Sequence, residues 1–97
     1  MNKYYVFFKE HKLSDEISTV QQGFRLEFKN GVLISVAFGD GTFSDKGLNT
    51  AEVAVIDKYD NCYEFTDDKL IKHKDAFVNA RVTTDNLVTI MDLAKSL

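Results

Sequence analysis

Hydrophobic and polar positions alternate most regularly between Phe24 and Ile56. In the run FRLEF, apolar residues alternate with charged ones, which is the period-two pattern of a strand with one buried face. The run VLISVAF follows the pair Asn30-Gly31, which tolerates positive φ and is typical of hairpin turns. The pattern therefore predicts a β-hairpin at the centre of the chain.

The register of this hairpin follows from the side chains that each loop length would bury. A two-residue turn would put the apolar positions of the two strands on opposite faces. A three-residue loop over residues 29–31, with Gly31 left-handed at a bulge, unites six apolar side chains on one face, so we predict this loop. The pairs that it forms are Phe28 with Val32, Leu26 with Ile34 and Phe24 with Val36.

Two segments precede the hairpin. The aromatic run KYYVFF, residues 3–8, predicts a first strand. Residues 9–22 fit a short helix and an extended segment equally. Leu13, Ile17 and Val20 would share one face of a helix, but β-branched residues in the same segment suit an extended chain.

Turn residues and apolar runs divide the chain after the hairpin. Glycine, aspartate and asparagine predict a loop at 39–50, and Asp67-Asp68 is expected to end a strand. The expected elements are strands at 51–57 and 62–65 joined by a turn at 58–61, then a lysine-rich loop, then a last short strand at 77–82.

The C-terminal segment has the strongest helical pattern of the chain. Thr83, Thr84 and Asp85 offer N-capping oxygens and an acidic first turn. Apolar residues then recur with helical spacing at Leu87, Ile90, Met91, Ala94 and Leu97. The predicted fold class is α+β, an antiparallel sheet of about five strands with this helix packed on one face.

Length and composition predict one soluble domain. The chain has 97 residues, 44% of them hydrophobic, which suits a single domain over residues 1–97. The only cysteine, Cys62, rules out an intramolecular disulfide and fits a reducing compartment. Because no apolar run is long enough to span a membrane and the first residues lack a signal-peptide pattern, we expect a cytoplasmic protein.

The residues that could carry catalysis or hold a metal lack the spacing that either role requires. His11, Cys62 and His73 lie far apart in sequence, without a paired metal-ligand motif. No histidine adjoins Cys62 to activate its thiol. We therefore predict no catalytic residues, no metal and no cofactor, and expect that the protein is not an enzyme.

The glycine-rich segment 39–50 is the main candidate for ligand binding. Gly39-Asp40-Gly41 follows a strand, but no lysine stands at the spacing of a phosphate-binding loop. Asp40 and Asp45 lack the further oxygen ligands of a calcium loop. A surface turn is therefore the simpler interpretation.

Charge is unevenly distributed along the chain. Residues 39–68 hold eight acids and two bases, whereas residues 69–81 hold four bases and one acid. An acidic surface repels nucleic acid and attracts a basic protein surface, so we expect a protein or nucleoprotein partner and no direct contact with nucleic acid. An ordinary solubilising surface would explain the same imbalance equally.

The run FKNGVLISVAFGDGTFSDKGLNTAEVAVIDKYDN, followed by VTTDNLVTIMDLAKSL, resembles a set of small uncharacterised bacteriophage and prophage proteins. The shared features are an NG hairpin, a VxFGxG ending, an AEVAV strand, an Asp/Asn turn and a C-terminal helix. The resemblance covers roughly two thirds of the chain. It implies a phage or mobile-element origin, a bacterial host cell and an accessory role in host takeover or evasion of bacterial immunity.

Two functions follow from these observations. The first is a non-catalytic inhibitor of a bacterial defence system, similar to an anti-CRISPR protein, that binds its partner through an acidic face. The expected contact residues are Asp40, Phe43, Asp45, Tyr59 and Asp60. The alternative is a small ligand- or nucleotide-binding domain, or an enzyme, that uses the loop at 39–50. An edge strand at KYYVFF would also allow a homodimer.

Overall fold

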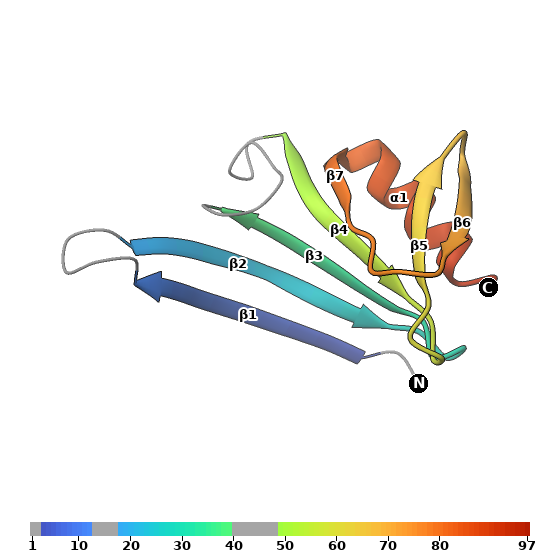
Figure 1. The fold of residues 1–97 in the computed structure, drawn as a ribbon, viewed down its shortest axis with the longest axis horizontal. Coiled ribbons are helices and arrows are strands. Elements are labelled where there is room, and N and C mark those ends of the chain that lie inside the picture. The colour runs from blue at the N-terminus through green and yellow to red at the C-terminus, as the bar shows by residue number, and fades with distance from the viewer. Residues whose placement is uncertain (1–2, 13–17, 40–48) are drawn as a thin grey trace.

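The computed structural model describes residues 3–12, 18–39 and 49–97, with side chains for 22–39 and 49–97. Within these residues the chain forms a sheet of seven strands and one helix (Figure 1). The elements are β1 (Lys3–Lys12), β2 (Ser18–Glu27), β3 (Leu33–Gly39), β4 (Thr50–Ile56), β5 (Cys62–Thr66), β6 (Lys69–His73), β7 (Asn79–Thr83) and α1 (Thr84–Ala94).

The strands follow one another across the sheet in sequence order, from β1 to β6, and each neighbouring pair is antiparallel. The last strand, β7, pairs with β4. Two strands therefore share one edge of β4: β7 pairs along its first half, and β5 pairs only at Ile56. Figure 1 shows the result: β5 and β6 diverge from the plane of β1 to β4.

The central hairpin has the register that the sequence predicts. Leu26 pairs with Ile34 and Phe24 with Val36. The amide of Phe28 donates to the carbonyl of Val32 at 2.9 Å, which closes the three-residue loop. Gly31 has φ +83°, and a Cβ there would lie 2.8 Å from the Cβ of Lys58. Glycine is thus required both for its conformation and for the close approach of the next turn.

The C-terminal helix is confirmed as well. The hydroxyl of Thr83 caps it by accepting a hydrogen bond from the amide of Asn86 at 3.3 Å. Ile90 and Ala94 are completely buried, and Leu87 and Met91 pack against the core at their side. Four residues of the predicted apolar stripe therefore form the face that meets the sheet. The fifth, Leu97, lies beyond the end of α1 and is 45% exposed.

The core lies between α1 and one face of the sheet. Its most buried side chains come from three elements: Ile34 and Val36 on β3, Val53 and Val55 on β4, and Ile90 on α1. The helix contacts β4, β6 and β7, so it covers the part of the sheet where β5 and β6 diverge (Figure 1). The described residues form an α+β fold with the helix on one face of the sheet, as predicted.

The largest error of the sequence interpretation is β6, which we assigned to a lysine-rich loop. Asp67-Asp68 ends β5, as predicted, but Thr66 pairs with Lys69, so the two aspartates form a two-residue hairpin turn into a further strand. Both aspartates have positive φ, 50° and 56°, which such turns require. The sheet consequently exceeds the predicted size of about five strands.

The ambiguous segment 9–22 is extended wherever the structure describes it. Residues 9–12 belong to β1 and residues 18–22 to β2, while 13–17 lie outside the described residues. The strand preference of β-branched Thr19 and Val20 therefore prevails over the helical spacing. The last strand is displaced from the predicted 77–82 to Asn79–Thr83.

Candidate functional site

The structure places two of the five predicted contact residues. Tyr59 and Asp60 lie together in the turn between β4 and β5. Asp40, Phe43 and Asp45 lie outside the described residues. β3 ends before those three residues, at Gly39, and β4 begins after them, at Thr50. Thr50 lies at the end of β4 away from the turn, roughly 20 Å from it, given the rise per residue of a strand. We call residues 57–61 the Tyr59 turn.

A single carboxylate organises the Tyr59 turn. Oδ1 of Asp57 accepts hydrogen bonds from the amides of Tyr59 and Asn61, both at 2.9 Å. Oδ2 accepts from the side-chain amide of Asn61 at 3.0 Å and from the hydroxyl of Tyr63 at 2.9 Å. The backbone also closes the turn, because the amide of Asp60 donates to the carbonyl of Asp57 at 3.0 Å.

These contacts determine the charge states in the turn. Burial raises the pKa of Asp57, but the hydrogen bonds from Asn61, Tyr63 and Tyr59 outweigh it and lower the pKa to about 2. Burial, together with the hydrogen bond to the Asp57 carboxylate and its charge, raises the pKa of Tyr63. At neutral pH the carboxylate of Asp57 is therefore ionised, and the hydroxyl of Tyr63 in β5, which donates to it, is protonated.

Asp57 holds the turn while Tyr59 projects from it. The Tyr59 side chain is 74% exposed, and the Nζ of Lys58 lies 5.3 Å from the centre of its ring. Asp60 is exposed and has φ +66°. An exposed aromatic ring and an exposed carboxylate thus occupy neighbouring positions on a backbone that Asp57 fixes.

The sequence interpretation missed the role of Asp57. We placed Asp57 at the end of the strand at 51–57 and gave it no part in holding the turn, whereas its carboxylate accepts hydrogen bonds from the amides of Tyr59 and Asn61. The signal was present in the sequence, because an aspartate followed two residues later by a turn residue often accepts that residue's amide. The bond from Tyr63 could not be read from a local pattern, because it crosses from the turn into β5.

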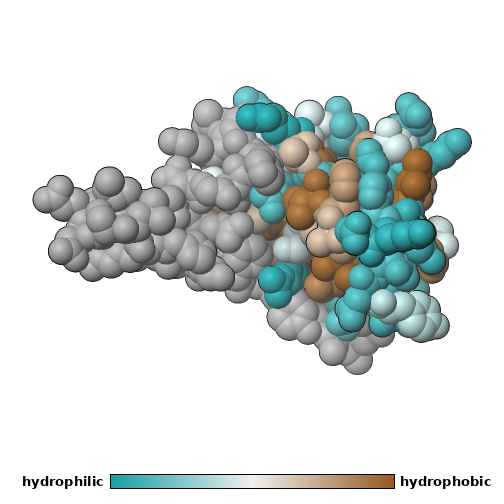
Figure 2. Space-filling view, viewed as in Figure 1, coloured by the Kyte–Doolittle hydropathy of each residue, from teal (hydrophilic) through white to brown (hydrophobic). Residues whose placement is uncertain are grey.

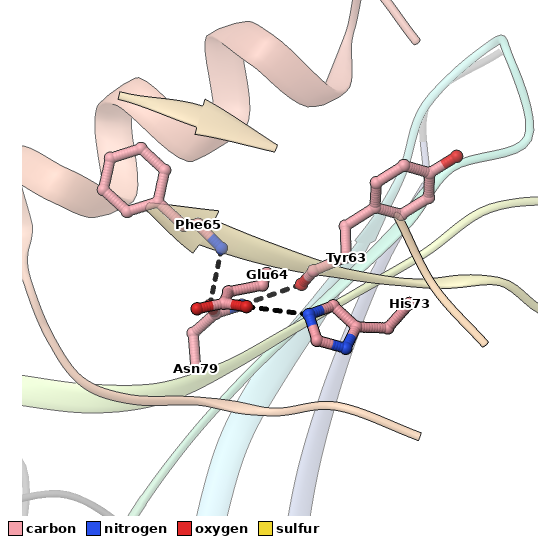
Figure 3. Close-up of polar contacts among 5 residues, drawn as sticks. All are labelled: Tyr63, Glu64, Phe65, His73 and Asn79. Carbon is pink, nitrogen blue, oxygen red and sulfur yellow. Dashed lines mark hydrogen bonds and ion pairs between the residues drawn. The ribbon is translucent and has the colours of Figure 1, made fainter. Parts of the chain in front are cut away.

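A buried amide occupies the place where β4 and β5 diverge. The side chain of Asn79 is 7% exposed, and its Nδ2 donates to the carbonyls of Val53 and Tyr63, both at 3.1 Å. Its Oδ1 accepts from the amide of Phe65 at 2.8 Å (Figure 3). One side chain thus satisfies backbone groups of two strands that no longer reach each other.

A second polar contact lies close by, between β5 and β6. Nε2 of His73 lies 2.7 Å from Oε1 of Glu64 (Figure 3). The ring of Phe77 stacks on the imidazole with centroids 4.4 Å apart. His73 therefore ends a strand and contacts a carboxylate, instead of lying in the solvated basic loop that we expected. Among the described residues, no three His, Cys, Asp or Glu side chains group closely enough to hold a metal.

Among the hollows on the described surface are the following two. One, of about 190 Å³, lies at the start of α1 and is lined by residues such as Phe24, Phe38, Thr50 and Leu87. The other, of about 340 Å³, lies between β5 and β7. Its lining includes Glu64, Phe65, Phe77, Arg81 and Asn86.

Apolar and charged side chains are mixed over the described surface. Figure 2 shows apolar groups reaching the surface in the middle of one face, with hydrophilic groups around them. Residues 39–68 hold most of the acids, but pairing of β5 with β6 sets Lys69 and Lys72 beside the end of this segment. The surface over its described part is therefore not purely acidic. Among residues 22–39 and 49–97, the exposed large hydrophobic side chains are Tyr59, Ile71, Val78, Val88 and Leu97.

Comparison with known proteins adds no relative: no family model, no curated protein and no solved structure matches the chain. The helix that the structure describes, α1, has 11 residues and is too short to cross a membrane.

Proposed function

We propose that this chain is a non-catalytic binding protein of phage or mobile-element origin, which inhibits a bacterial defence system by occupying the surface of one of its proteins. The observation that carries the proposal is the Tyr59 turn, in which an exposed aromatic side chain stands on a backbone fixed by Asp57. The resemblance to phage proteins supplies the biological setting.

The geometry of the turn suits recognition of a protein surface. Binding loses less conformational entropy when the contact loop is already ordered. Tyrosine is among the residues that contribute most to interfaces, because it buries a large area with few rotatable bonds. The carboxylate of Asp60, next to Tyr59, suits a partner with lysine or arginine at the matching position.

The test is protection of a phage from a defined defence system. Bacterial strains that each carry one CRISPR or other defence system would express the chain and be challenged with a phage that the system targets. We expect plaques to return in at least one strain. Tyr59→Ala should abolish this protection. Val88→Ala should retain it, because Val88 is another exposed residue, 59% accessible, but lies on α1.

Two outcomes would count against the proposal. If no strain of the panel regains plaques, the chain does not inhibit those systems. If Tyr59→Ala protects as well as the wild type, the Tyr59 turn is not the contact surface. Equal expression and equal thermal stability of the two variants are required before either comparison is made.

The second candidate is a small-ligand domain, favoured by the hollow of about 190 Å³ at the start of α1. Its lining includes Phe38, which precedes the glycine-rich segment at 39–50, and Asn49 and Thr50, the last two residues of that segment. A thermal-shift screen with nucleotides and divalent cations tests this candidate. A true ligand at 100 times its dissociation constant should add ~2.7 kcal/mol of stability. No shift with any compound would favour the protein-binding function.

A further inference from the structure

We propose that two copies of this chain form a symmetric dimer in which their β1 strands pair antiparallel along the outer edge of each sheet. β1 has 10 residues and stands at one end of the strand order. Among the described elements it pairs with β2 alone. A strand of this length at an edge offers a long row of backbone donors and acceptors to another strand.

The opposite end of the strand order is a poorer template. β6 has only five residues. Lys69 and Lys72, at its start and near its end, are exposed, and the exposed Lys74 follows directly. Both edge strands carry lysines, since β1 contains Lys3, Lys9 and Lys12, so the distinguishing feature is length. A short edge strand offers few backbone groups for pairing, and this difference selects β1 as the edge that associates.

The sequence of β1 restricts the register of such a dimer. In an antiparallel pair, a residue whose N–H and C=O groups point toward the other strand stands opposite another such residue. A residue whose groups point away stands opposite another whose groups point away, and the two kinds alternate along each strand. A two-fold axis perpendicular to the sheet therefore passes beside one residue, which faces its own copy. Only a few residues of β1 can occupy this central position if most of the strand is to be paired.

Phe7 is the central residue that gives the most compatible pairs. It places the apolar residues of the strand centre opposite one another and sets no lysine opposite a lysine. The resulting pairs are Lys3 with His11, Tyr4 with Glu10, Tyr5 with Lys9, Val6 with Phe8, and Phe7 with Phe7.

The neighbouring registers are worse. With Val6 at the centre, Lys3 of each copy would face Lys9 of the other. Two pairs of like charges would then stand opposite each other, one on each side of the axis. Centring on Phe8 would set Val6 against Glu10 and Phe7 against Lys9, so charged residues would face apolar ones. The Phe7 register also closes the assembly, because each copy uses its β1 edge once and no β1 edge is left for a third chain.

Sedimentation equilibrium and thiol cross-linking test the dimer and its register together. The wild-type chain should have a solution mass of twice 11.0 kDa at micromolar concentration. For cross-linking, Cys62→Ser removes the native thiol. Tyr4→Cys and Glu10→Cys are then introduced into separate chains of that background, and a short thiol-specific reagent is added.

The proposed register predicts a cross-link only when the two variants are mixed. Residue 4 of one copy stands opposite residue 10 of the other, whereas each residue lies roughly 20 Å from its own counterpart, six positions along the strand. Each variant alone therefore serves as the control for the mixture. Both variants should sediment like the wild type before the reagent is added, which shows that they still fold and associate.

Two results would overturn the proposal. A chain that sediments at 11.0 kDa up to high micromolar concentration is a monomer and has no β1 dimer. A chain of twice that mass whose mixed variants do not cross-link, or whose single variants cross-link equally well, associates through another surface or another register.

Discussion

Asp57 is the residue on which the proposed contact surface depends. Its carboxylate accepts four hydrogen bonds, and the groups that donate them come from the turn itself and from Tyr63 at the start of β5. The contacts therefore fix the conformation of the turn and its position relative to the sheet. The aspartate that holds the turn is distinct from the residues, Tyr59 and Asp60, that are free to meet a partner.

Asp57 should make the stability of the protein depend on pH in the acidic range. Its pKa is about 2 in the folded chain, below its ordinary value of 3.8. The folded state is therefore stabilised by the ionised form, fully above about pH 4 and progressively less as the pH falls toward 2. Because the side chain is partly solvated, we expect a contribution of about 1–2 kcal/mol.

Urea denaturation at several pH values would measure this contribution. Asp57→Asn should lower the free energy of unfolding at pH 7 by about 1–2 kcal/mol and should flatten the decline between pH 4 and pH 2. Asp60→Asn is the matched control, because Asp60 is exposed and asparagine tolerates its positive φ. An Asp57→Asn variant with the full wild-type pH dependence would contradict this role.

Arg81 has a backbone conformation that destabilises the fold. It has φ +50° within β7, where Ala80 and Arg81 together oppose Glu52 of β4, because Val82 pairs with Ala51 and Asn79 with Val53. The position is a β-bulge, at which glycine is usual. Left-handed backbone costs a residue with a side chain on the order of 1 kcal/mol.

Arg81→Gly should therefore raise the midpoint of thermal unfolding, by roughly 4–8 °C for a gain of about 1 kcal/mol. The neighbouring Ala80→Gly should lower the midpoint, because glycine there adds only freedom to the unfolded chain. If both variants lose stability, the arginine side chain stabilises the fold by more than its backbone strain costs.

At the scale of elements, Asn30 connects the central hairpin to the helix. Its Nδ2 donates to the carbonyls of Ala94 at 2.8 Å and Leu97 at 3.1 Å, while its Oδ1 accepts from the amide of Val32 at 3.1 Å. The carbonyls at the end of a helix lack partners within the helix. The turn residue of the hairpin thus caps α1 from 64 positions away in sequence.

Asn30→Ala should destabilise the protein by about 1–2 kcal/mol through the loss of these bonds. Asn30→Asp should cost more at pH 7. It keeps the acceptor for Val32 but directs a negative charge at the carbonyl end of the helix. Lys29→Ala, at the exposed neighbouring position, should change stability by less than ~0.5 kcal/mol. An Asn30→Asp variant as stable as the wild type would exclude the capping role.

Local patterns predict the elements whose stability is local. The alternation around Asn30-Gly31 fixes the hairpin register, because a slip of one residue would expose the apolar face. The stripe that contains Ile90 and Ala94 predicts α1 for the same reason. β6 was missed because Asp67-Asp68 looks like a strand ending, although two aspartates at positive φ also form a hairpin turn.

Other contacts depend on how distant strands diverge, which a local pattern does not encode. The buried amide of Asn79 satisfies Val53 and Tyr63, 26 and 16 positions away, because β5 departs from β4 after Ile56. Within the candidate site, the sequence identified Tyr59 and Asp60 by the composition of their turn. It did not identify the role of Asp57, since the bond from Tyr63 forms only in the folded chain.

At the scale of the whole molecule, the sheet and α1 hold the Tyr59 turn in a defined place. The turn follows β4, whose Val53 and Val55 are completely buried, and precedes β5, whose divergence is stabilised by Asn79. The turn also packs against the loop of the central hairpin, because Lys58 of the turn lies against Gly31 of that loop. The hairpin, the helix and the turn therefore meet at one end of the sheet, so the proposed contact surface is part of the rigid fold.

The most direct test of this account is the affinity of the chain for a purified protein of the defence system that the plaque assay identifies. Tyr59→Ala should weaken binding by at least ~30-fold, equivalent to the ~2 kcal/mol that marks a dominant interface residue. Val88→Ala should stay within about threefold of the wild type, as expected for an exposed residue outside the interface. If Tyr59→Ala binds as tightly as the wild type while remaining folded, the Tyr59 turn is not the surface through which the protein acts.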